Sequence, residues 1–165
     1  MSAPDTQESK DATQYRPCVG VMLINGEGQA FVGKRIDTKE GDWWQMPQGG
    51  VDEGEDVREA VYRELYEETG IAREHVEILG QTENELFYDL PPELHGKLWG
   101  GKYRGQRQTW YCARFTGSDD DVNLEAHTHP EFSDWRWVDR ASLPELIIPF
   151  KKPVYRTVVE EFREF

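Results

Sequence analysis

The chain has 165 residues, a formal net charge of −13, 37% hydrophobic residues and 12% aromatic residues. This length suits a single domain with a substantial core, and the acidic charge argues against a protein that grips long nucleic acids through a broad basic surface. It does not exclude a local basic pocket that binds one nucleotide or the end of a nucleic acid.

The cysteines and the N-terminus favour a reducing, cytoplasmic setting. Cys18 and Cys112 both fall in apolar runs, which predicts buried free thiols and no disulfide framework. The first 14 residues are polar and lack the apolar segment of a signal peptide, so we expect a flexible tail over 1–14 and one folded domain over 15–165. No run approaches the ~20 apolar residues of a membrane span, so we expect no membrane partner.

Periodicity and turn residues predict strands and helices in a mixed order. An apolar run predicts a strand at 18–24, and Asn25-Gly26 predicts a hairpin turn into a second strand at 29–35. The further expected strands cover 76–81, 85–88, 106–115, 122–124 and 132–138. The expected helices cover 56–69, 141–146 and 151–165. Strands interrupted by a central helix and closed by a C-terminal helix favour a mixed sheet with helices on both faces.

The stretch from Gly49 to Ile71 carries the clearest chemistry. Glu64, Glu67 and Glu68 have i, i+3, i+4 spacing, so a helix would place three carboxylates on one face. A hard divalent cation relieves their repulsion, because Mg²⁺ prefers oxygen ligands and binds through a few carboxylates and substrate phosphates. A solvated acidic face is the alternative interpretation of this spacing alone.

The surrounding residues make the pattern specific. The stretch reads G-x5-E-x7-R-E-U-x-E-E-x-G-U, with U aliphatic, and its specified positions are Gly49, Glu55, Arg63, Glu64, Leu65, Glu67, Glu68, Gly70 and Ile71. This pattern resembles the Nudix box without a mismatch. The resemblance implies a Nudix hydrolase with an α/β/α sandwich, a mixed sheet and a catalytic loop-helix.

The resemblance also assigns roles within this stretch. It implies that Glu64, Glu67 and Glu68 hold Mg²⁺, for which Mn²⁺ or another divalent cation can substitute. Glu55 and Arg63 are expected to pin the acidic loop to the helix by an ion pair. Gly49 would allow the backbone to approach a ligand or metal closely, and Gly70 would end the helix as a C-cap.

A fourth acid is expected in a late loop, because the resembled enzymes place one there for metal binding or as the base. The segment Asp121-Val122-Asn123-Leu124 resembles that loop and puts the acid on Asp121. Glu125 and a helix glutamate compete with Asp121 for the role of base. His127 and His129 could suggest a transition-metal site, but with no cysteine or third histidine nearby in the sequence we favour a mobile loop without metal.

Further segments extend the resemblance to the bacterial (di)nucleoside polyphosphate hydrolases and RNA pyrophosphohydrolases. These segments are 15–17, 44–50, 103–110, 130–132, 135–137 and 149–151. The expected substrate-binding residues are Arg16, Gln48, Lys102, Tyr103, Arg104 and Gln106. Arginine suits bidentate phosphate contacts, and a tyrosine can bond a phosphate or stack on a base. The loop at 90–101 is a candidate lid or wall for the substrate.

Three functions follow as hypotheses. The first is Mg²⁺-dependent hydrolysis of dinucleoside polyphosphates, with an asymmetric cut of diadenosine tetraphosphate into ATP and AMP. The alternative is an RNA 5′-pyrophosphohydrolase that converts a 5′-triphosphate into a monophosphate. The third is a Nudix binding module without catalysis, which the intact box argues against. The expected partners are a nucleotide or the 5′ end of RNA, and not DNA, while the oligomeric state and the number of metal ions stay open.

Overall fold

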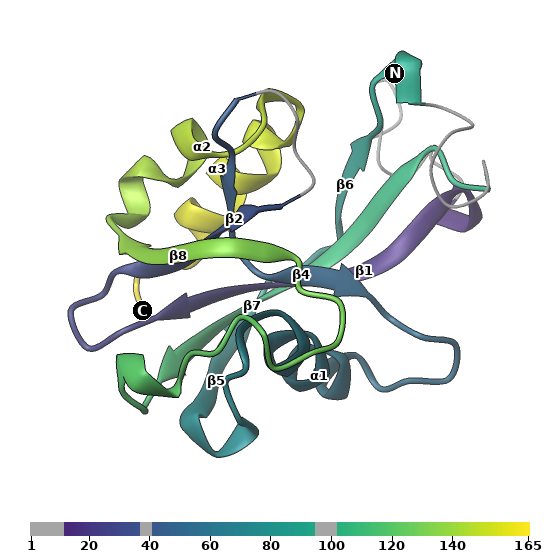
Figure 1. Ribbon diagram of the computed structural model, residues 1–165. Helices are drawn as coiled ribbons and strands as arrows, with labels where there is room; N and C mark the ends of the chain where they lie inside the picture. Colours follow the sequence, from purple (N-terminus) through teal and green to yellow (C-terminus); the bar gives the residue numbers. More distant parts are fainter. Residues whose placement is uncertain (1–11, 37–40, 95–101) are drawn as a thin grey trace.

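The computed structural model describes residues 12–36, 41–94 and 102–165 (Figure 1). Most of the expected tail and the second half of the expected lid lie outside these residues. The strands are β1 (Tyr15–Ile24), β2 (Ala30–Arg35), β3 (Trp44–Gln45), β4 (Gln48–Gly50), β5 (Val76–Gln81), β6 (Leu86–Asp89), β7 (Gly105–Phe115) and β8 (Phe132–Val138). The α-helices are α1 (Val57–Thr69), α2 (Leu143–Leu146) and α3 (Lys152–Glu161).

The strands form one mixed sheet. Its main order is β3-β2-β1-β7-β5, while β4 pairs with β1, β6 with β7 and β8 with β2. β1 and β7 run parallel, in register from Tyr15 opposite Gly105 to Ile24 opposite Arg114. This register sets Arg16 directly opposite Gln106, so two expected substrate-binding residues lie side by side.

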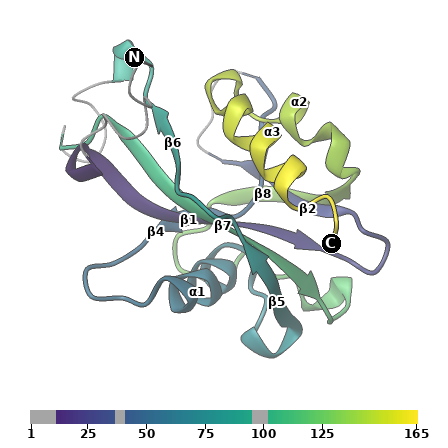
Figure 2. The same cartoon turned by 180° about the vertical axis from the view of Figure 1, so that it is seen from behind.

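Helices cover both faces of the sheet. Figure 2 shows α1 on one side and α2 with α3 on the other. Successive residues of β1 point to opposite faces: Val21 packs in the cluster that contains Leu65 of α1, and Met22 packs in the cluster that contains Val158 of α3. The expected α/β/α sandwich is therefore confirmed. None of the helices in the described ranges is long and apolar enough to cross a membrane.

The helix α1 begins and ends where its capping residues predict. The Asp56 side chain accepts hydrogen bonds from the backbone N–H groups of Arg58 (2.9 Å) and Glu59 (3.3 Å), which satisfies two of the free donors of the first turn. Gly70 has φ +74°, and its N–H donates to the Tyr66 carbonyl at 2.9 Å. The left-handed conformation at Gly70 stops α1 at Thr69.

One expected strand does not form. The segment 122–124 is irregular, and the side chains of Val122 and Leu124 each pack against the core cluster beneath α1. Between them the Asn123 N–H donates to the Thr69 carbonyl at 2.7 Å. This segment is thus tied to the end of a helix instead of a sheet edge. The last helix is also shorter than expected, because α3 ends at Glu161.

Candidate active site

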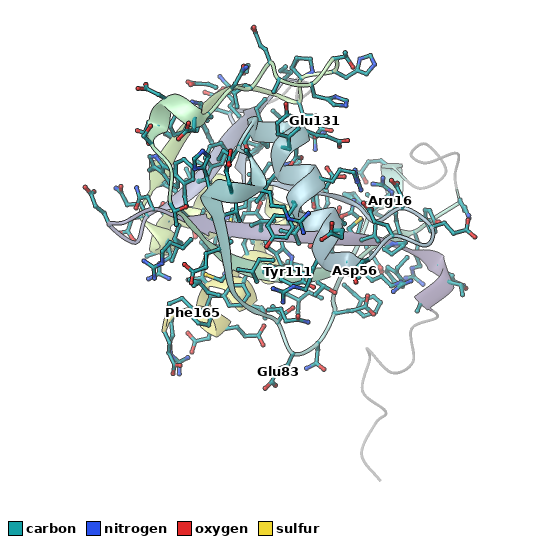
Figure 3. The ribbon with its side chains drawn as sticks, turned by 90° about the horizontal axis from the view of Figure 1, so that it is seen from below. Arg16, Asp56, Glu83, Tyr111, Glu131 and Phe165 are labelled. Atoms are coloured by element: carbon teal, nitrogen blue, oxygen red, sulfur yellow. The ribbon has the colours of Figure 1, made fainter. Side chains whose placement is uncertain are left out.

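Two of the α1 glutamates are buried against β4. Glu64 is 7% exposed and Glu68 is fully buried. The backbone N–H of Gln48 donates to Oε2 of Glu68 at 3.0 Å. A Cβ at Gly49 would lie 2.2 Å from Oε2 of Glu64, so only glycine lets the strand lie against this carboxylate. Figure 3 looks onto this side of the molecule, with Arg16, Asp56 and Glu131 labelled.

Arg63 ties the acidic loop to the helix, as expected. Its guanidinium contacts both carboxylate oxygens of Glu55, at 2.7 and 2.8 Å, and donates to the Gly50 carbonyl at 2.8 Å. The hydrogen bonds from Arg63 to Glu55 lower the pKa of the Glu55 carboxyl. Nη1 of Arg63 also lies 3.0 Å from Glu64 Oε1 and 3.2 Å from Glu67 Oε2. One arginine therefore holds the loop and reaches two of the three helix glutamates.

Glu131 joins this cluster, although the sequence analysis assigned it no role. It directly precedes β8, and its carbonyl accepts from the Ile36 N–H at 3.0 Å, so the pairing of β8 with β2 brings it to the site. The charge of its carboxylate contributes to the raised pKa of both Glu64 and Glu68. No local sequence signal marks this residue, because its place at the site depends on the pairing of β8 with β2.

The two buried acids of this cluster, Glu64 and Glu68, resist ionisation. Burial raises the pKa of Glu64 to about 7, against the opposing effect of Arg63. Burial, followed by the charges of Glu131 and Glu64, raises the pKa of Glu68 well above its usual range. Oε1 of Glu68 is buried and has no hydrogen-bond donor in the described part of the chain. Binding of either a proton or a cation would reduce the repulsion between these carboxylates.

The structure does not bring Asp121 to the cluster. Asp121 ends a short 3-10 turn (Asp119–Asp121), where its carboxylate accepts from the Ser118 N–H at 2.8 Å and lies 3.8 Å from His75 Nε2. Glu125 is exposed, and its N–H donates to the Asn123 side chain. Neither acid lines the cavity beside Glu64. The Asp121 side chain is engaged at the turn because it closes a capping box with Ser118.

A cavity of about 440 Å³ opens beside the acid cluster. Glu64, Glu67 and Glu131 form one wall. The remaining walls carry three kinds of group: cationic Arg16, Arg35 and Lys151, aromatic Trp43, Tyr88 and Phe150, and the amides of Gln45, Gln48 and Gln106. Arg16, Gln48 and Gln106 are thus brought together as expected, whereas Arg35 and Lys151 were not expected.

Gln108 fixes two of these amides. Its Nε2 donates to Oε1 of both Gln48 and Gln106, each at 2.7 Å, and its own Oε1 accepts from the Trp110 indole N–H at 2.8 Å. The oxygens of Gln48 and Gln106 are therefore used as acceptors, and their NH₂ groups are the ends that can donate to an anion.

The expected residues 102–104 do not line this cavity. Arg104 pairs with Asp89 at 2.8 Å, and Lys102 lies 5.2 Å from the centre of the Tyr103 ring. Tyr103 instead lines a second cavity of about 650 Å³, together with Arg16 and Arg107. Arg16 therefore borders both cavities.

The cluster fits a divalent cation held in an open site. In the described ranges no three Asp, Glu, His or Cys side chains are already gathered around one point. The orphaned Oε1 of Glu68 and the mutual repulsion of its neighbours nevertheless supply hard oxygen donors that a cation would satisfy. Mg²⁺ characteristically binds through one or two carboxylates and takes its other ligands from water and phosphates.

Comparison with known proteins assigns the family. Residues 14–158 match the NUDIX domain, and the chain therefore belongs to the Nudix family. It is a Nudix hydrolase, as its box indicates. The chain is 61% identical over 150 residues to the RNA pyrophosphohydrolase of Novosphingobium aromaticivorans, covering 91% of this chain and 93% of that protein. It is 55% identical to the RNA pyrophosphohydrolase of Erythrobacter litoralis, with 91% and 92% covered.

Solved structures share the fold at low sequence identity. A C. elegans Ap4A hydrolase in a binary complex has a TM-score of 0.65 and 20% identity, with 91% of this chain and 99% of that chain covered. The E. coli dihydroneopterin triphosphate pyrophosphohydrolase has a TM-score of 0.70 and 20% identity, with 90% and 96% covered. These likenesses support the Nudix fold alone.

Proposed function

We propose that the chain is an RNA 5′-pyrophosphohydrolase that works with Mg²⁺ or another divalent cation. It would hydrolyse the 5′-triphosphate end of RNA to a monophosphate and release pyrophosphate, or two phosphates in successive steps. The observation that carries the proposal is an acid cluster, with Glu64 and Glu68 buried, that opens into a cavity with cationic and aromatic walls. The relatives named RNA pyrophosphohydrolase, at 52–61% identity, favour RNA over the dinucleoside polyphosphates expected first. An RNA substrate would place the enzyme in the cytoplasm.

Glu64, Glu67, Glu68 and Glu131 are the residues that would hold the cation. When bound, a divalent cation neutralises phosphate charge and lowers the pKa of a water. The protein's part is to keep these carboxylates in place: the Gln48 N–H orients Glu68, and the Gly49 backbone supports Glu64. A carboxylate of the cluster that is free to take a proton would then serve as the base.

The cationic residues would bind the phosphates. Arg16, Arg35 and Lys151 line the same cavity as the acids, and arginine favours bidentate phosphate contacts. On a chain of net charge −13 this local group of cations suits the end of an RNA more than its length. The rings of Trp43, Tyr88 and Phe150 offer a base a stacking surface worth ~1–3 kcal/mol.

Dinucleoside polyphosphate hydrolysis is the second candidate, and the second cavity favours it. This cavity adjoins the first at Arg16 and carries the Tyr103 side chain. A substrate with a nucleoside at each end of a phosphate chain could place one nucleoside in each cavity, with its phosphates beside Arg16. Both substrates would use the same acid cluster.

Steady-state kinetics of glutamine variants test the acid assignment. Glu68→Gln and Glu131→Gln should each lower kcat on a triphosphorylated oligonucleotide on the order of 10²–10³-fold, because each removes one charge from the reacting centre. Asp121→Asn and Glu125→Gln serve as matched acids from the same loop, and their kcat should stay within about twofold, as for surface changes away from the site. A large loss in Asp121→Asn with full activity in Glu131→Gln would reverse the assignment.

The same assay ranks the substrates. The ratio of kcat/KM on triphosphorylated RNA to that on diadenosine tetraphosphate should exceed one for the wild-type chain. A ratio below one would make the dinucleoside polyphosphate the principal substrate. Negligible rates on both substrates with Mg²⁺ present would contradict the proposed reaction itself.

A further inference from the structure

The loop between β7 and β8 meets α1 at three successive points. The Asn123 N–H donates to the Thr69 carbonyl at 2.7 Å. His127 then places its Nε2 atom 3.9 Å from Oε1 of Glu67. At the end of the loop, Glu131 meets Glu68. The loop that supplies the fourth acid therefore also sets an imidazole beside Glu67, the most exposed of the three clustered helix glutamates.

The hydrogen bonds of His127 define which ring nitrogen faces Glu67. The backbone N–H of His129 donates to Nδ1 of His127 at 3.3 Å. Because Nδ1 accepts, the proton of the neutral ring sits on Nε2. Nε2 is also the ring nitrogen that lies 3.9 Å from Oε1 of Glu67, so the neutral ring carries its hydrogen-bond donor near the carboxylate.

Glu67 needs such a partner more than its neighbours do. Glu64 and Glu68 are buried against the backbone of β4, whereas the Glu67 side chain is 32% exposed. Its two oxygens face different groups: Oε2 lies 3.2 Å from Arg63 Nη1, and Oε1 faces His127. Within the described ranges, the contacts that would orient a metal ligand at this position come from Arg63 and His127.

We propose that His127 is a positioning residue that orients Glu67 for the divalent cation, through a hydrogen bond from Nε2–H to Oε1. Hydrogen bonds in unliganded sites are often long and tighten in the complex, and the 3.9 Å separation would close as Glu67 engages the cation. Mutation of a residue that hydrogen-bonds to a metal ligand typically lowers metal affinity or activity by about 10–100-fold. The inference rests on the proposed function, because it takes Glu67 as a ligand.

Four variants of the full chain test this role. His127→Ala should raise the Mn²⁺ dissociation constant, measured by electron paramagnetic resonance, and lower kcat/KM on triphosphorylated RNA, each by about 10-fold. His127→Gln should retain most of the Mn²⁺ affinity and most of the kcat/KM, because the glutamine amide nitrogen can occupy the position of Nε2. His127→Asn should not, because its amide nitrogen lies near Nδ1. His129→Ala is the matched control and should bind Mn²⁺ like the wild type, since its backbone N–H remains.

The readouts separate this inference from the proposed function. Unchanged Mn²⁺ affinity in His127→Ala, or equal rescue by asparagine and glutamine, would overturn the positioning role while leaving RNA hydrolysis untouched. A wild-type chain that fails to hydrolyse RNA but loses Mn²⁺ affinity in His127→Ala would overturn the proposed substrate and keep the role of His127. Thermal unfolding of each variant shows whether the fold is retained.

Discussion

Replacement of Glu64 by glutamine should stabilise the metal-free protein at alkaline pH. Burial raises the pKa of Glu64 from 4.5 to about 7. Below pH 4.5 the carboxyl is protonated in both the folded and the unfolded chain, and its full contribution to stability is present. Between pH 4.5 and 7 the unfolded chain ionises first, so stability is lost as the pH rises through the folded pKa.

The size of this effect follows from the same two pKa values. At 1.36 kcal/mol per pH unit, the complete loss above pH 7 is about 3 kcal/mol. Glutamine has nearly the same shape, keeps an oxygen for Arg63 and cannot ionise. The stability advantage of Glu64→Gln over the wild type should therefore grow by about 2 kcal/mol between pH 5.5 and pH 8.5.

Urea unfolding in the presence of EDTA measures this difference. Glu55→Gln is the matched control, and its effect on stability should have the opposite pH dependence. Arg63 lowers the pKa of Glu55, so this carboxylate stabilises the fold above its unfolded pKa, and the stabilisation is lost as the pH falls. The control should be less stable than the wild type at pH 8.5. A Glu64→Gln chain that is less stable than the wild type at pH 8.5, or whose advantage does not change with pH, would refute the reasoning.

Three further predictions concern the helix cap and the cavity. Gly54→Ala should lower the free energy of unfolding by about 1 kcal/mol, because Gly54 has a positive φ. Gly70→Ala should lower it by more, because Gly70 also has a positive φ and a Cβ there would lie 2.4 Å from the Asn123 carbonyl oxygen. Thermal unfolding compares the two variants. Gly49→Ala should displace the Glu64 carboxylate and lower kcat by at least ~10²-fold. Phe150→Ala should raise the KM for triphosphorylated RNA ~10-fold with little change in kcat.

Local sequence patterns are sufficient to predict the helix α1 and the position of its glutamates. Asp56 and Gly70 mark the two ends of α1, and the spacing of the glutamates fixes which of them share a face. The Glu55–Arg63 pair spans only eight residues, and it forms as expected. These features depend on neighbours in the chain, which periodicity and capping rules describe well.

The rest of the site depends on which strands pair. Glu131, Arg35 and Lys151 come from the start of β8, the end of β2 and the turn before α3, and no local signal links them. The expectation for Asp121 rests on a short resemblance around Asn123. In the structure Asn123 anchors the loop to α1, so the chain must run on for several residues before an acid, Glu131, reaches the cluster.

The parallel pairing of β1 with β7 has a consequence for synthesis of the chain. It joins Tyr15 to Gly105, so the central strand pair forms only after some ninety intervening residues have been made. Until then the apolar segment from Val19 to Ile24 has no partner on that edge, and contacts so distant in sequence form slowly. A ribosome-bound chain that ends before residue 105 would expose this segment, which makes it a target for chaperones during translation.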